Sequence, residues 1–477
     1  MIRFLCALLF VLALPCASRA QTPAAQAVGW SGAVELPGGL KLEFAVELTT
    51  DAGTISIPMQ GVKDLKLSDV AVSAKLLKFS IKEAGAVWEL KVADDGQTAE
   101  GTLTQGGTFK TTMKRLAAGE APQKDLARPQ EPKAPFPYET SEVSFENRTA
   151  GITLAGTLTT PKGSGPFPCA VMVTGSGPQD RDEALLGHKP FLVIADHLTR
   201  HGIAVLRYDD RGVAKSTGKF DTATSTDFGT DALAGVEFLK SRKEIDAKHI
   251  GIIGHSEGGL IAPMCAARSK DVAFIVLLAG TGVSGAELLP IQSKLISIAG
   301  GTDPVQAEKD SSESALILKM VASGKPDAEV TEAIRAAVLR DLRADPKMKD
   351  LTEEKLAESA NGIVLEQTKT LFSPWFRQFL ALDPRDSLKK VTCPVLALNG
   401  EKDMQVPPKV NLPEIEKALK AGGNADFTIT ELPNLNHLFQ NCKTGAPSEY
   451  AGISETFAPV ALETVTNWIR KRTGLDH

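Results

Sequence analysis

The sequence predicts an α/β protein, with a mostly parallel eight-stranded sheet and a helical cap, preceded by a small all-β domain. Three features lead to this fold class. Residues 30–116 contain short apolar runs that alternate with polar residues between turn residues, as in antiparallel strands. From residue 141 onward, short apolar strands alternate with helical segments, which indicates a sheet with helices on both faces. Residues 281–390 interrupt this alternation with helical periodicity, which predicts an inserted cap.

The first 20 residues have the pattern of a secretory signal peptide. Arg3 precedes an apolar run that is too short to span a bilayer, and Ser18-Arg19-Ala20 fits cleavage after Ala20. The alternative is a lipid anchor at Cys16, which the proline before it disfavours. We therefore expect an exported protein, periplasmic or secreted, and no later segment is apolar enough to predict a membrane span.

The rest of the chain divides into three parts by composition. Residues 22–116 form the predicted antiparallel β domain, which shows no cluster of ionisable side chains that suggests chemistry and is expected to serve packing or interaction. Residues 117–139 carry several prolines among charged and small residues, which is typical of a linker. Residues 140–477 form the α/β domain, with the cap at about residues 281–390.

The net charge and the cysteine content of the chain limit the kinds of partner and cofactor that it is expected to bind. The chain has 477 residues, a net charge of -5 and a pI near 5.9, which argues against nucleic acid as a partner. The four cysteines beyond the signal peptide form no Cys-x-x-Cys pair, so a zinc or redox site is not expected. Cys169, Cys265 and Cys393 lie in apolar segments, which favours buried free thiols over a disulfide; the fourth is Cys442. The oligomeric state is left open.

Eight strands are expected in the α/β domain. In chain order they are Ser141–Phe145, Thr153–Thr159, Cys169–Val173, Ala204–Tyr208, Ile250–Ile253, Phe274–Leu278, Val395–Leu398 and Phe427–Glu431. Between the sixth and seventh strands, apolar periodicity predicts two helices of the cap, at Thr331–Ala344 and Glu353–Thr370.

The pentapeptide Gly254-His255-Ser256-Glu257-Gly258 follows the fifth strand and precedes a helical segment. Gly-x-Ser-x-Gly between a strand and a helix is typical of a nucleophile elbow, in which the serine occupies a strained turn and the glycines avoid collisions. The pattern therefore predicts Ser256 as a catalytic nucleophile at the edge of the sheet.

A serine nucleophile needs a base and an acid to orient it. His437 lies directly after the eighth strand, and the other histidines lie in helices, before strands, inside the elbow or at the terminus. The acid is expected on the loop after the seventh strand, where Asp403 is the first choice and Glu401 the alternative. The chain order Ser256, Asp403, His437 is the order expected for hydrolases with this kind of elbow.

Two backbone donors are expected to form an oxyanion hole. The N–H of Glu257 follows the nucleophile at the start of a helix, where the helix dipole favours negative charge. The second donor is expected from the glycine-rich loop after the third strand, from the N–H of Ser176 or, alternatively, of Gly177.

These motifs together resemble those of a known superfamily. Residues 141–477 resemble the α/β-hydrolases, and more narrowly bacterial esterases of the dienelactone-hydrolase-like or serine-aminopeptidase-like group. The stretches that carry the resemblance are Gly175-Ser176-Gly177-Pro178-Gln179-Asp180-Arg181-Asp182, Arg207-Tyr208-Asp209-Asp210-Arg211-Gly212, the elbow, Asn399-Gly400-Glu401-Lys402-Asp403 and Leu435-Asn436-His437. One departure is Ala214, where such proteins often have glycine, and it affects a supporting loop only.

The resemblance implies hydrolysis of a small carboxylic ester, usually with a short acyl chain, through Ser256, Asp403 and His437 and an acyl-enzyme. No metal or cofactor is required. An aminopeptidase or thioesterase on the same fold is the alternative within the enzymes, and an exported binding protein without activity is the alternative outside them. The aromatic residues 372–379 either cover the acyl pocket or belong to a helix core. Asp210 and Arg211 are expected to form a structural pair that braces the turn after the fourth strand, with substrate contact as the alternative.

Overall fold

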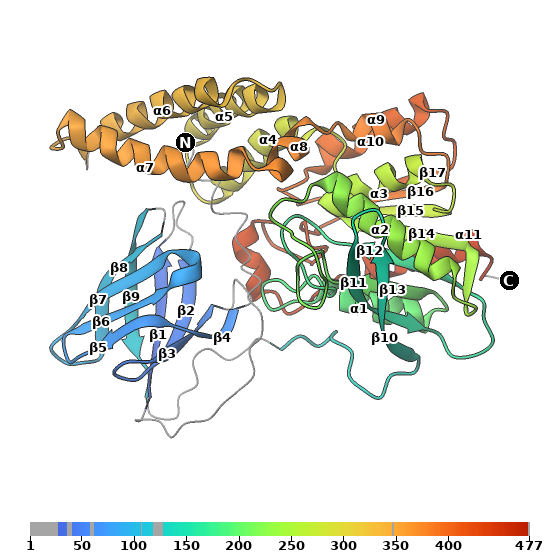
Figure 1. Cartoon of the computed structure of the whole chain (residues 1–477), viewed down its shortest axis with the longest axis horizontal. Helices are drawn as coiled ribbons and strands as arrows, with labels where there is room; N and C mark the ends of the chain where they lie inside the picture. The colour runs from blue at the N-terminus through green and yellow to red at the C-terminus, as the bar shows by residue number, and fades with distance from the viewer. Residues whose placement is uncertain are drawn as a thin grey trace.

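The structure is a computed structural model, and it describes residues 27–35, 41–57, 62–105, 107–117, 127–345 and 348–475. The predicted signal peptide, residues 1–20, lies outside the described residues. Two sheets organise the described chain: a nine-stranded antiparallel sheet near the N-terminus and an eight-stranded mixed sheet in the C-terminal part (Figure 1).

The N-terminal sheet curls on itself like a barrel. Its strand order is β4-β3-β2-β1-β9-β8-β7-β6-β5, and a single residue, Leu67, joins the two edge strands. Alternate side chains point inward, so that Trp88 and Leu90 of β7 are buried between exposed neighbours. The strands are β1 (Val28–Glu35), β2 (Lys41–Leu48), β3 (Gly53–Ile57), β4 (Val62–Lys66), β5 (Ser68–Val72), β6 (Leu76–Ile81), β7 (Ala86–Val92), β8 (Thr98–Thr104) and β9 (Thr108–Arg115).

The second sheet has the order β10-β11-β13-β12-β14-β15-β16-β17. β11 pairs antiparallel with both of its neighbours, and every other neighbouring pair is parallel. Each of the eight expected strands is found. Their bounds are β10 (Glu139–Asn147), β11 (Ile152–Thr160), β12 (Phe167–Val173), β13 (Ala204–Tyr208), β14 (Ile245–His255), β15 (Phe274–Leu278), β16 (Val395–Gly400) and β17 (Phe427–Leu432).

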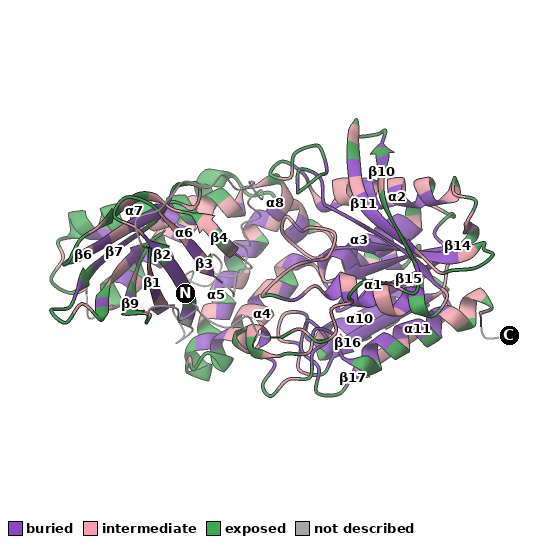
Figure 2. Ribbon diagram, turned by 90° about the horizontal axis from the view of Figure 1, so that it is seen from below, coloured by how far each residue is buried: buried purple, intermediate pink, exposed green. Residues whose placement is uncertain are grey.

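Helices cover both faces of this sheet, because the strands are apolar on both sides. One face packs against α2 (Ser225–Lys240), α3 (Glu257–Arg268) and α10 (Pro408–Ala421). The other face packs against α1 (Pro190–Arg200) and α11 (Pro459–Thr473). Figure 2 shows the strands buried in the middle of these layers and the exposed residues on the outer helix surfaces.

The expected cap lies between β15 and β16 and is helical. The predicted helix at 331–344 falls within α6, and the predicted helix at 353–370 falls within α7. The cap has its own apolar core, built mainly by α5 to α8, and Figure 1 shows α6 and α7 on the side of the N-terminal sheet. Its helices are α4 (Gly285–Ala299), α5 (Pro304–Ala322), α6 (Asp327–Ala344), α7 (Glu353–Leu371), α8 (Pro374–Ala381) and α9 (Pro384–Leu388).

None of the described helices has the length and apolarity needed to cross a membrane. The four cysteines Cys169, Cys265, Cys393 and Cys442 are all free thiols, and the first two are buried.

Candidate active site

Ser256 lies in the turn between β14 and α3. Its φ of 53° is positive, which is strained for a residue with a side chain. A Cβ at Gly254 would lie 2.0 Å from the Gly258 carbonyl oxygen, and a Cβ at Gly258 would lie 2.1 Å from the Val173 carbonyl oxygen. Because both positions leave no room for a side chain, the two glycines of the pentapeptide are required by the turn itself.

The structure brings Asp403 and His437 together. Asp403 follows β16 and His437 follows β17, and His437 Nδ1 lies 2.9 Å from Asp403 Oδ2. The other carboxylate oxygen, Oδ1, accepts the backbone N–H groups of Gln405 and Val406, each at 2.8 Å. Since the carboxylate fixes the proton on Nδ1, it leaves Nε2 of His437 as an acceptor. Glu401, the alternative acid, instead accepts the backbone N–H of Asn434 at 2.9 Å.

The loops of Ser256 and His437 are in contact, since His255 Nε2 lies 3.1 Å from the His437 carbonyl oxygen. Within the described part of the chain, no hydrogen bond joins the Ser256 hydroxyl to His437. The ring of His255, the residue before the serine, lies 4.9 Å from the His437 ring between centroids. In enzymes without bound substrate, such catalytic contacts are often long and shorten in the complex.

The two expected oxyanion donors are available. Gly175 lies against the serine, since a Cβ at Gly175 would be 3.3 Å from Ser256 Cβ, and its N–H donates to Glu183. The N–H groups of Ser176 and Glu257 have no acceptor among the described residues. Gly177, the alternative donor, has a φ of 98°, a conformation that favours glycine.

Sequence reasoning missed a buried connection behind the serine. Glu183 Oε1 accepts the Gly175 N–H at 2.7 Å and lies 2.9 Å from His255 Nδ1, while His255 Nε2 lies 3.1 Å from the His437 carbonyl oxygen. Burial lowers the pKa of His255, but the charge and hydrogen bond of Glu183, the bond to the His437 carbonyl and the charge of Asp403 outweigh it, so this pKa is raised. The sequence offers only a weak signal for this connection, because Glu183 is one of three acidic residues in the stretch after the glycine-rich loop.

Glu257 contributes a side chain as well as a backbone donor. Its Oε1 accepts the Ser225 hydroxyl at 2.6 Å and the Trp375 indole N–H at 2.9 Å, so the elbow is joined to α2 and to α8 of the cap. Burial raises the pKa of Glu257, against the effect of its hydrogen bonds with Ser225, Trp375 and Ser176.

The cap aromatics pack both within the cap and against the sheet domain. Phe376 belongs to the apolar core of the cap, whereas Phe379 packs with Leu260 and Met264 of α3. Trp375 stacks on Phe379 and directs its N–H to the elbow.

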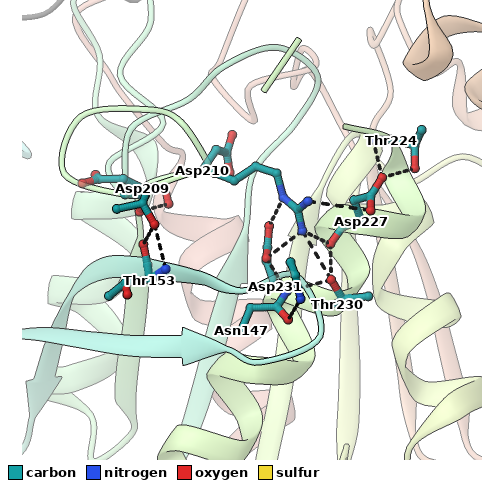
Figure 3. Close-up of polar contacts among 12 residues, drawn as sticks. Asn147, Thr153, Asp209, Asp210, Thr224, Asp227, Thr230 and Asp231 are labelled. Atoms are coloured by element: carbon teal, nitrogen blue, oxygen red, sulfur yellow. Dashed lines mark hydrogen bonds and ion pairs between the residues drawn. The ribbon is translucent and has the colours of Figure 1, made fainter. Parts of the chain in front are cut away.

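Asp210 and Arg211 do not pair with each other, contrary to expectation. Asp210 accepts from Thr174 and from the backbone N–H of Gln179. Arg211 forms an ion pair at 2.7 Å with Asp231, and Figure 3 shows Asp231, Asp227 and Thr230 gathered around this guanidinium. Both residues are nevertheless structural, because they fix the loop after β13 to its neighbours.

Among the described residues, no group of His, Cys, Asp or Glu side chains is placed to hold a metal ion.

Comparisons with known proteins relate the chain to hydrolases. Residues 150–420 match the family model described as X-Pro dipeptidyl-peptidase (S15 family). The chain is 29% identical over 331 residues to Esterase EstD of Thermotoga maritima, which covers 69% of this chain and 68% of the relative. Similar solved structures include the α/β-hydrolase GrgF of Penicillium (17% identity, TM-score 0.41, covering 70% of this chain and 99% of that one) and Est1E of Butyrivibrio proteoclasticus (17% identity, TM-score 0.38, covering 70% and 99%).

The resemblance of residues 141–477 to α/β-hydrolases is confirmed by these matches. Because the family model matches more than half of its length, the chain belongs to the X-Pro dipeptidyl-peptidase (S15) family.

Proposed function

We propose that this protein is a serine carboxylesterase that hydrolyses small esters with short acyl chains. Ser256 attacks the acyl carbonyl while Nε2 of His437 takes its proton, and the N–H groups of Ser176 and Glu257 donate to the oxyanion. The alcohol leaves with the proton from His437, and water then attacks the acyl-enzyme by the same route. Asp403 holds the tautomer of His437 that this sequence of proton transfers requires.

The observation that carries the proposal is the contact between His437 and Asp403 at the edge of the sheet where Ser256 follows β14. The two partners come from separate loops after β16 and β17, and they are buried together with the acid fixed by two backbone donors. A surface turn and a loop histidine of no function would not require this arrangement.

A second candidate, release of N-terminal dipeptides, is favoured by the family to which the chain belongs. Such a peptidase needs an acidic group that holds the free amine of its substrate. Glu257 lies in the elbow and Glu183 contacts it through His255, and the described structure shows both carboxylates buried and accepting from protein donors. This occupancy supports the esterase.

The test compares p-nitrophenyl acetate with glycyl-prolyl-p-nitroanilide as substrates of the full chain. We expect the acetate to be the better substrate and Ser256→Ala to lower kcat by at least about 10³-fold. Ser269→Ala, at the other end of α3, is the matched control and should retain wild-type activity. Equal hydrolysis by wild type and Ser256→Ala would refute a serine hydrolase, and a strong preference for the anilide would establish the peptidase.

A further inference from the structure

A bridge of two side chains joins three loops of the candidate active site. Glu183 lies in the segment after the glycine-rich loop, His255 lies in the elbow, and the last acceptor is the carbonyl of His437. Through Glu183 Oε1, the same bridge holds the Gly175 N–H at the start of the loop that offers Ser176. The predicted base and the predicted oxyanion loop are therefore connected through the residue that precedes the nucleophile.

The hydrogen-bond partners of His255 determine the protonation state of its imidazole ring. Nδ1 faces a carboxylate oxygen and Nε2 faces a carbonyl oxygen, and both of these groups accept without donating. A neutral imidazole has one N–H and satisfies only one partner. The imidazolium satisfies both, and it forms a buried ion pair with Glu183.

The bridge is held in place at a cost to stability. Glu183 is 3% exposed and has a φ of 50°, which is strained for a residue with a side chain. Its second oxygen, Oε2, is buried without a hydrogen-bond partner. Strain and an unpartnered polar atom at one residue are typical of a position held for function.

We propose that Glu183 and His255 are positioning residues. They fix the loop of His437 relative to the oxyanion loop, so that the catalytic base and the oxyanion N–H donors both lie next to the same acyl group. This inference rests on the proposed esterase function. The bridge is proposed to act on the rate of the chemical step by holding these loops in position, not by direct contact with the substrate.

The test uses the full chain with His255→Gln, Glu183→Gln and the double variant. A glutamine at 255 has a single donating nitrogen and cannot serve both acceptors, and a glutamine at 183 removes the charge that keeps the imidazolium. His249→Gln is the matched control, since His249 makes a 2.7 Å contact to Asp246 in the same strand, far from the elbow. A fluorophosphonate reacts covalently with an activated serine, so the labelled fraction gives the concentration of folded active sites. Dividing the rate by this concentration gives kcat per folded site.

Each single variant should lose about 10²-fold in kcat per labelled site, because displacements of about 1 Å near the chemistry have effects of that size. KM should change little, and the double variant should lose no more than either single one because both changes break one bridge. Wild-type kcat in His255→Gln, or losses that multiply in the double variant, would overturn the proposal. A wild-type protein without Ser256-dependent hydrolysis would instead overturn the proposed function.

Discussion

The carboxylate of Asp403 is the most constrained acceptor of the site at the scale of single residues. Oδ1 accepts two backbone N–H groups and Oδ2 accepts the Nδ1–H of His437, so both oxygens of the carboxylate have hydrogen-bond partners. An asparagine at this position keeps the oxygen for the backbone donors and turns its NH2 toward His437. Two donors would then face each other, which forces the imidazole into the tautomer that cannot accept the serine proton.

Asp403→Asn should therefore lower kcat for p-nitrophenyl acetate by roughly 10³- to 10⁴-fold while the fold is retained. Glu401→Gln is the matched control, because Glu401 is two residues away and, among the described residues, accepts a hydrogen bond from the backbone of Asn434 alone. Steady-state kinetics on both variants check the assignment. A larger loss of kcat in Glu401→Gln than in Asp403→Asn would show that Glu401, and not Asp403, is the catalytic acid.

A second prediction concerns His188, which lies buried against Thr456, Tyr450 and Gln440. Burial lowers the pKa of His188 to about 4, with a further effect from the charge of Arg128 and against the bond to the Tyr450 carbonyl. The unfolded chain binds this proton below about pH 6.5, and the folded chain binds it only below about pH 4. Stability is therefore unaffected above pH 6.5 and falls as the pH decreases from 6.5 toward 4.

In urea unfolding at pH 7 and pH 5, wild type should lose about 2 kcal/mol more on acidification than His188→Gln. The difference between the two proteins removes the contribution of the other titrating groups. Parallel losses in both proteins would show that His188 does not carry this pH dependence.

The sequence located the candidate nucleophile, base and acid because each follows a strand, and strands end at one edge of the sheet. It missed Glu183 and His255. Their connection depends on a positive φ at Glu183 and on the direction of the His255 ring, and neither leaves a trace in residue type or spacing. The same limit explains the wrong pairing of Asp210 with Arg211, which are adjacent in sequence but face different neighbours.

Helix α8 is the element through which the cap reaches the elbow. Trp375 donates to Glu257, and Gln378 accepts the backbone N–H of Thr226 at the start of α2. Apolar periodicity predicts helices such as α6 and α7, whose buried residues repeat along one face. It does not predict which helix of the cap contacts the sheet domain, because that contact depends on single polar groups.

Trp375→Phe should keep the aromatic stacking on Phe379 and lose the N–H donated to Glu257. We expect the free energy of unfolding to fall by about 1–3 kcal/mol, as for a buried acceptor that loses a donor. We also expect esters with longer acyl chains to gain in kcat/KM relative to acetate, because α8 is held less tightly over the elbow. An acyl-chain series of p-nitrophenyl esters measures this ratio.

Trp468→Phe on α11 is the matched control, since its indole N–H donates to Thr428 on the opposite side of the sheet. An unchanged acyl-chain preference in Trp375→Phe, or an equal change in both variants, would show that α8 does not determine which acyl chains the enzyme accepts.

At the scale of the whole molecule, the segment before β10 is more than a connection between domains. Arg128 donates to the carbonyls of Leu186, Gly187, Ala451 and Ile453. Gln130 contacts the backbone of Thr456 and Phe457. These loops also hold His188, which contacts Gln440 and through it Asn436, the residue before His437. Proline content predicts a linker here, but it carries no information about these contacts.

A chain of residues 127–477 should therefore be more stable and more active than a chain of residues 139–477, although both contain the complete mixed sheet. In the full chain, Arg128→Ala should lower the free energy of unfolding by about 2–4 kcal/mol, because several carbonyls lose a charged donor. Arg148→Ala, which removes a nearly fully exposed arginine, is the control. Equal stability and kcat for the two shortened chains would contradict this function of the segment.

The distance of these contacts along the chain has a consequence for biogenesis. Arg128 and Ile453 are separated by 325 residues, and Gln130 and Phe457 by 327. A chain synthesised from its N-terminus presents the first partner of each contact long before the second. The loops around His437 can thus be fastened only after nearly the whole polypeptide has left the ribosome, so a prematurely ended chain that already contains Ser256 would remain without hydrolytic activity.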